Sequence, residues 1–190
     1  MNELKPPGAG LPPFELAWLN GMFRVGRTLL TDRRAMSMFL TEAHTIVDLI
    51  EQTDIDFASQ QVLVPRYQGM EDSSRNWSLL MVLDHLCRVD REILRTIDVL
   101  RDGIVPRGEI DIADYKPDQD AGAEVIDNFL MLVNEYETRI TQLMPLRTMA
   151  RFPHPWFGLL DAHGWHCLAA IHHRIHRRQA RKIAALQGMT

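Results

Sequence analysis

The C-terminal stretch of residues 165–186 constrains the fold most, because it contains no proline or glycine and carries a strong helical pattern. At about 100° per residue, a stripe roughly 100° wide collects Trp165, Leu168, His172, Ile175, His176, Gln179, Ile183 and Leu186. The opposite side carries Arg174, Arg177, Arg178 and Arg181. The pattern predicts an amphipathic helix that buries one face.

Two histidines lie in the middle of this otherwise apolar stripe. His172 and His176 are four residues apart, so on a helix their imidazoles lie one above the other and can hold a single ion. Gln179 follows one turn later and is placed to orient a ligand or to bond a substrate. Because burying two unpaired imidazoles is costly, the pair indicates either a metal site or histidines that are hydrogen-bonded in the core.

The rest of the chain is also helical in pattern. Residues 1–13 are rich in proline and glycine and read as an extended lead-in, and residues 53–75 read as a long loop. Apolar side chains recur at helical spacing over residues 14–30, 32–52, 76–101 and 121–144, with Asp32 as an expected N-cap. No segment alternates with period two, so no strands are expected. The prediction is a single all-α domain over residues 1–190, an up-down four-helix bundle with an added N-terminal helix.

Composition excludes several classes of function. A net charge of −4 over 190 residues does not indicate a basic surface that would bind nucleic acid or an anionic membrane. No apolar run approaches about 18 residues, and no signal peptide is evident. The two cysteines do not make a disulfide framework, which favours a reducing compartment. We therefore expect a cytoplasmic protein that contacts neither nucleic acid nor membrane.

Other histidines compete as ligands. His85 lies at the margin of the apolar face of its helix, where a boundary histidine is more common than a ligand. His163 and Cys167 share the far flank of the last helix, with His163 close to the arginine side, and form an alternative ligand pair. His173 lacks a histidine partner one turn along, because Arg177 occupies that position.

Carboxylates near His85 are candidates for acid or base chemistry. Glu92 lies on the same side of the predicted helix as His85, whereas Asp90 projects into the apolar stripe. Glu92 is therefore the better candidate for a group that moves a proton.

These residues carry a family resemblance. His85 in NWSLLMVLDHL, followed by His172, His176 and Gln179 in IHHRIHRRQ, resembles the pattern of the DinB/YfiT-like superfamily of metal-binding helical bundles. The segment HPWFG at residues 154–158 and Trp165 are similar to one branch of that superfamily. The resemblance implies that His85, His172 and His176 hold one divalent metal, zinc first, with nickel or iron as alternatives.

The resemblance also implies an activity. It points to hydrolysis by a metal-bound water, or to transfer of a low-molecular-weight thiol onto a small-molecule substrate, with Gln179 and Glu92 supporting the reaction, and it suggests a homodimer. The alternative is a non-catalytic binding or stress-response module whose histidines are structural. A cavity beside an open coordination position favours the enzyme, and a closed cluster of hydrogen-bonded histidines favours the module.

Overall fold

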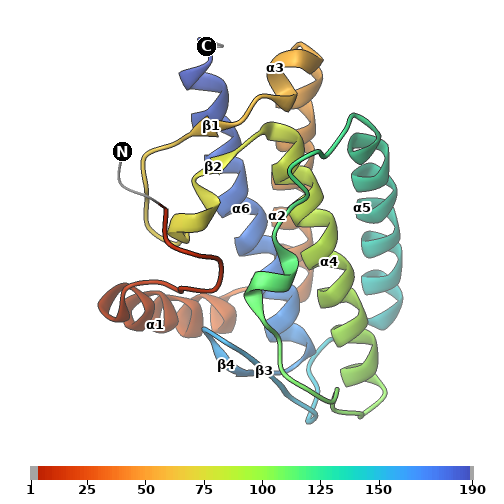
Figure 1. The fold of residues 1–190 in the computed structure, drawn as a ribbon. Helices are drawn as coiled ribbons and strands as arrows, with labels where there is room; N and C mark the ends of the chain where they lie inside the picture. Colours follow the sequence, from red (N-terminus) through yellow and green to blue (C-terminus); the bar gives the residue numbers. More distant parts are fainter. Residues whose placement is uncertain (1–3, 189–190) are drawn as a thin grey trace.

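The structure, a computed structural model, describes residues 4–188 (Figure 1). Its four long helices form a bundle that confirms the predicted fold class: α2 (Asp32–Glu51), α4 (Leu79–Arg101), α5 (Glu124–Leu143) and α6 (Ala162–Leu186). The added helix α1 (Pro13–Leu29) lies outside the bundle and crosses it at one side. Within the described residues, no helix combines the length and apolar character needed to cross a membrane.

Helix directions within the bundle follow the order up, down, down, up, rather than the up-down alternation expected from the sequence. Asp32 at the start of α2 bonds His163 near the start of α6, so these two helices are parallel. Arg139 and Asp98, both near the ends of their helices, pair across α5 and α4, which are parallel too. The connection over residues 102–123, with the short 3-10 helix η2 (Ile112–Tyr115), returns along the bundle to allow this (Figure 1).

Side-chain caps fix where three bundle helices begin. Thr31, Ser78 and Asp161 each accept a hydrogen bond from the backbone amide three residues later. Asp32 was expected to cap α2, but Thr31 does so, because both carboxylate oxygens of Asp32 are used in contacts with the far end of the chain. The other predicted boundaries lie within about three residues of those observed.

The expectation of no strands is wrong, because two short antiparallel pairs flank the bundle. β1 (Val62–Leu63) pairs with β2 (Asn76–Trp77), and β3 (Phe152–His154) pairs with β4 (Gly158–Leu160). The long loop between α2 and α4 also contains the short helix α3 (Ile55–Ser59) and the 3-10 turn η1 (Asp72–Ser74). Strands of two or three residues are too short to show a period-two pattern.

A partly buried ion pair joins the start of the bundle to its last helix. The Asp32 carboxylate accepts from His163 Nδ1 at 2.5 Å and from the amide of Leu146 at 3.0 Å, while His163 Nε2 donates to the carbonyl of Arg27 at 2.9 Å. The hydrogen bonds of His163 to Asp32, Cys167 and the Arg27 carbonyl outweigh burial and raise its pKa to about 10, so it is an imidazolium at neutral pH. Burial opposes ionisation of Asp32, but its bonds to His163 and Leu146 prevail and lower its pKa.

We predict that Asp32→Asn lowers the free energy of unfolding by about 3 kcal/mol at pH 6.5, the cost of leaving a buried charge without its partner. Since the pKa of His163 is raised, the stabilisation that its ion pair gives the folded state is complete below about pH 6.5 and disappears as pH rises through about 10. The decrease in the free energy of unfolding caused by Asp32→Asn should therefore be smaller at pH 9 than at pH 6.5. Urea unfolding at both pH values tests this, with the exposed Asp48→Asn as control. Equal losses at both pH values would show that charge is not the cause.

Candidate metal centre

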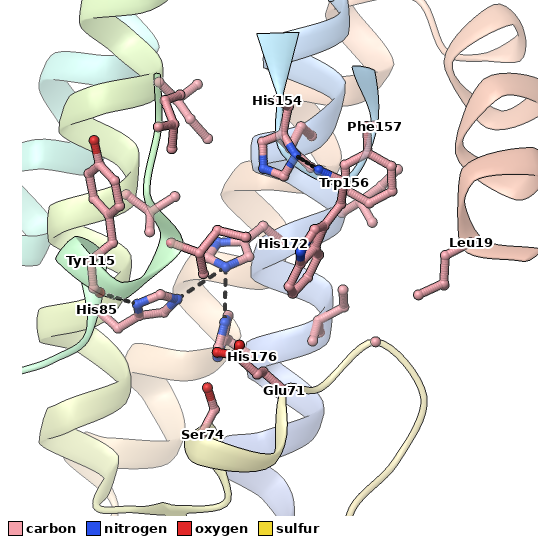
Figure 2. A pocket seen from close by; sticks show the side chains of 18 of the residues that line it. Leu19, Glu71, Ser74, His85, Tyr115, His154, Trp156, Phe157, His172 and His176 are labelled. Carbon is pink, nitrogen blue, oxygen red and sulfur yellow. Dashed lines mark hydrogen bonds between the residues drawn. The ribbon is translucent and has the colours of Figure 1, made fainter. Parts of the chain in front are cut away.

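Three histidines from two antiparallel helices converge on one point. His85 comes from α4, and His172 and His176 come from α6. The Nε2 atom of His172 lies 3.2 Å from that of His85 and 3.0 Å from that of His176 (Figure 2). Among the described residues this trio is the group of histidine, cysteine and carboxylate side chains whose ligand atoms lie close enough, within 4.8 Å, to hold an ion.

The outer nitrogens of two of these imidazoles are anchored. His85 Nδ1 donates to the carbonyl of Tyr115 at 2.6 Å, and His176 Nδ1 donates to Gln179 Oε1 at 2.9 Å. Gln179 is itself held by a bond of 2.7 Å from its Nε2 to the carbonyl of Ser74. Because each Nδ1 carries the proton, each Nε2 presents a lone pair toward the common point.

The donor set fits a divalent cation. Burial lowers the pKa of His85 to about 4, and burial together with neighbouring imidazoles lowers the pKa of His172 and His176 well below the usual value. The three rings are therefore neutral. Nε2 of His172 makes two short contacts, one with Nε2 of His85 and one with Nε2 of His176. It can carry only one proton, so it can donate a hydrogen bond in only one of these contacts at a time. His172 Nδ1 is also buried without a partner among residues 4–188. A tetrahedral zinc with bonds of about 2.0–2.1 Å separates its ligand nitrogens by about 3.3 Å, close to the contacts observed.

A cavity of about 320 Å³ opens beside the three histidines. Its walls are mostly apolar and include an aromatic side made by Phe23, Trp156, Phe157 and Trp165. Helix α1, the β3–β4 hairpin and η2 contribute further walls (Figure 2). Such a cavity is within the size range of small-molecule sites and leaves room next to the metal position.

An ion pair lies in the same wall as His85. Lys116 Nζ bonds the carboxylate of Glu71 and also donates to Ser74 Oγ at 2.9 Å. Burial alone would raise the pKa of Glu71, but the bonds from Lys116 and from the amide of Gly10 lower it. The pair therefore brings one positive and one negative group to the cavity without net charge. The sequence pattern does not predict either residue, since Glu71 and Lys116 come from the irregular segments on either side of α4.

A fourth histidine lines the cavity without joining the cluster. His154 Nδ1 accepts from the amide of Trp156 at 3.1 Å, so the ring's proton is on Nε2. Burial lowers the pKa of His154 to about 4, which keeps the ring neutral. Figure 2 shows His154 on the hairpin above His172. His154 is thus a neutral hydrogen-bond donor in the cavity wall. In the sequence, only its place in the HPWFG motif marks this histidine.

The remaining histidines of α6 are structural in their contacts. His173 is fully buried, and its Nε2 lies 2.7 Å from Oδ2 of Asp90 on α4. Its partner is therefore a carboxylate on another helix and not a histidine one turn along α6. His166 accepts at Nδ1 from the Tyr136 hydroxyl at 3.0 Å. The sequence predicts His163 close to the exposed arginine side, but it is buried, because the start of α2 and the end of α1 pack on it and bond both of its ring nitrogens.

The alternative ligand pair of His163 and Cys167 is not favoured by the geometry. Cys167 Sγ lies 3.4 Å from His163 Nε2, but both ring nitrogens of His163 are already bonded to Asp32 and to Arg27. Asp32 bonds His163 on its other ring nitrogen, and among the described residues these side chains do not form a group whose ligand atoms all lie within 4.8 Å of one another.

The carboxylate expected to move a proton lies on the cavity wall. Glu92 is partly buried there, two helical turns beyond His85 on α4, about 10 Å along the helix axis. Glu92 therefore faces the cavity rather than the metal position itself.

Comparison with known proteins gives the fold and no more. No protein-family model and no curated protein sequence matches this chain. Among solved structures, the chain is similar to TT2238, described as a four-helix bundle protein, with a TM-score of 0.55 and 22% identity over 83% of this chain and 99% of that one. At that identity the likeness supports the bundle architecture alone.

We predict that Gln179→Leu weakens zinc binding about 10- to 100-fold, because His176 loses the acceptor that orients its ring. Competition titration of the purified protein with a zinc chelator measures the change. Gln142→Leu, at an exposed position on α5, is the matched control and should bind zinc as the wild type does. An unchanged affinity in Gln179→Leu would mean that the Gln179 bond does not orient a ligand.

Proposed function

We propose that this protein is a metal-dependent enzyme of the DinB/YfiT-like type, with one divalent ion held by His85, His172 and His176. Zinc is the first choice of metal, because three neutral imidazoles form one of its common catalytic ligand sets, and nickel or iron are alternatives. The observation that carries the proposal is the convergence of three Nε2 atoms at the edge of an apolar cavity, with two of the outer nitrogens anchored.

Three protein ligands leave a coordination position for water or a thiol, whose pKa the bound metal would lower. The chain's own residues then have separate roles. Gln179 holds the ring of His176, and the carbonyl of Tyr115 holds that of His85. We assign Glu92 to a substrate atom away from the metal, since it lies about 10 Å along α4 from His85. The neutral His154 supplies a hydrogen bond from the opposite wall.

The cavity supports a small, largely apolar substrate with a polar group at the metal end. Its volume of about 320 Å³ suits a single small molecule, and its aromatic wall suits a flat or aliphatic portion. We propose either hydrolysis or transfer of a low-molecular-weight thiol to such a molecule. Both cysteines are free and buried, and burial raises the pKa of Cys87 to about 12, so neither is an exposed thiol.

Two cysteines that stay free support a cytoplasmic location, where a low-molecular-weight thiol substrate also stays reduced.

The second candidate is a non-catalytic module that binds a small molecule in the same cavity. One observation favours it: the three imidazoles already lie within hydrogen-bonding distance of one another. Such a module would bind ligand without turnover and without metal. The two candidates therefore differ first in metal content.

The proposal predicts about one equivalent of metal in untagged protein purified without chelators, and loss of that metal in a His172→Ala/His176→Ala variant. Elemental analysis measures both, with His44→Ala, an exposed histidine of α2, as the control that keeps its metal. Circular dichroism should show that the double variant still folds. A native protein that takes up no zinc, nickel or iron on incubation would leave the module as the function.

For the metal-loaded enzyme, we predict that Glu92→Gln lowers kcat at least about 100-fold with the metal content unchanged, because general acid or base catalysis contributes at least that factor. The substrate comes from panels of esters, amides and electrophiles with low-molecular-weight thiols. An unchanged kcat would remove Glu92 from the reaction while leaving the metal site intact.

A further inference from the structure

The outer face of α1 is apolar and uncovered. Only Phe23 of this helix is buried. The large apolar residues of the outer face and their exposed fractions are Phe14 87%, Trp18 47%, Met22 55%, Val25 59% and Leu29 69%. On a helix they fall within a strip about 80° wide that contains no charged residue. We call these five residues the α1 strip.

The α1 strip is large enough to be an interface. With about 200 Å² for a large apolar side chain, its five residues expose roughly 600 Å², the upper end of what monomers usually leave uncovered. The exposed Ala17, Gly21 and Thr28 extend the strip along one edge. The total approaches the about 800 Å² that each partner contributes to a standard interface.

The other side of α1 is fixed to its own bundle, so the strip cannot turn inward. The Glu15 carboxylate pairs with Arg66 at 2.5 Å and accepts from the amide of Gly69 at 2.8 Å. The side-chain amide of Asn20 donates to the carbonyl of Trp156. These polar contacts hold the helix in one rotation about its axis, with the α1 strip outward.

We propose that the α1 strip is covered by the α1 strip of a second copy, with the two helices antiparallel about a two-fold axis. In a two-fold interface the same surface of each copy must be complementary to itself. The α1 strip meets this condition in one register. In that register Phe14 faces the partner's Leu29, Trp18 faces the partner's Val25, and Met22 faces the partner's Gly21. Each large side chain at one end then meets a smaller one. Gly21, where an added Cβ would meet no neighbour, lets the helices approach closely at the centre.

A lipid surface fits the strip less well. Helices that lie in a membrane interface carry several basic residues along their polar side, whereas α1 carries only Arg24 and Arg27, and its Glu15 and Asn20 are bonded to the rest of the chain. The chain's net charge of −4 also opposes binding to anionic lipid. A second copy of the chain meets neither obstacle.

The dimer would also secure one wall of the cavity. Leu19 and Phe23 on the inner side of α1 line the cavity together with Met22, which lies at the edge of the α1 strip nearest to them. Pairing of two α1 helices therefore holds that wall against the bundle. This inference stands without the proposed metal chemistry, because it depends on α1 alone.

Sedimentation velocity of the untagged full chain from 5 to 100 µM tests the proposal. We expect twice the monomer mass in the wild type and the monomer mass in Trp18→Glu/Val25→Glu. Met131→Glu, at a 71% exposed position on α5, is the matched control and should remain a dimer. Circular dichroism confirms that each variant folds.

A cross-linking experiment fixes the register. Gly21→Cys should form an intermolecular disulfide on mild oxidation, because in this register the axis lies between positions 21 and 22 and the two Gly21 positions are close neighbours beside it, whereas Met131→Cys should not. A monomeric wild type at 100 µM, or a dimer that persists in Trp18→Glu/Val25→Glu, overturns the proposal. Binding of a monomeric wild type to phosphatidylcholine/phosphatidylglycerol vesicles would assign the strip to a bilayer instead.

Discussion

The candidate site depends on keeping three imidazoles neutral, buried and aimed at one another. A buried imidazole needs a partner for each nitrogen, and three lone pairs that converge repel unless something positive lies between them. Hydrogen bonds from His85 to the Tyr115 carbonyl and from His176 to Gln179 fix which nitrogen faces inward. Nδ1 of His172 has no hydrogen-bond partner within residues 4–188, so the third ring lacks such an anchor there. A cation at the common point satisfies the three inner nitrogens together.

The path of the chain explains why the groups that hydrogen-bond to the histidines lie at the site. Antiparallel α4 and α6 bring His85 beside His172, which makes the cluster a product of bundle packing (Figure 2). The connection over residues 102–123 has to run the length of the bundle, because α4 and α5 point the same way, and in passing it presents Tyr115 and Lys116 to the cavity (Figure 1). The loop before α4 adds Ser74, which holds Gln179. Irregular segments thus supply the groups that orient the ligands.

Local pattern in the sequence predicts the helices, because each buries a face with a period near 3.6 residues, and it places His172, His176 and Gln179 on one side of α6. His85 needed the family resemblance, since its position at the edge of a helix face is ambiguous by itself. The cavity groups His154, Glu71 and Lys116 could not be predicted, because loop geometry places them. The pairing of His173 with Asp90 was missed for a related reason: spacing along one helix says nothing about a partner on another.

Extended X-ray absorption at the zinc edge of the zinc-loaded protein tests the central claim most directly, because it reports the atoms bound to the metal. The account predicts three imidazole nitrogens at about 2.0–2.1 Å and one further light atom, with the imidazole scattering lost in the His172→Ala/His176→Ala variant. A sulfur scatterer at about 2.3 Å would place the metal at a cysteine and contradict the account, as would zinc held without imidazole.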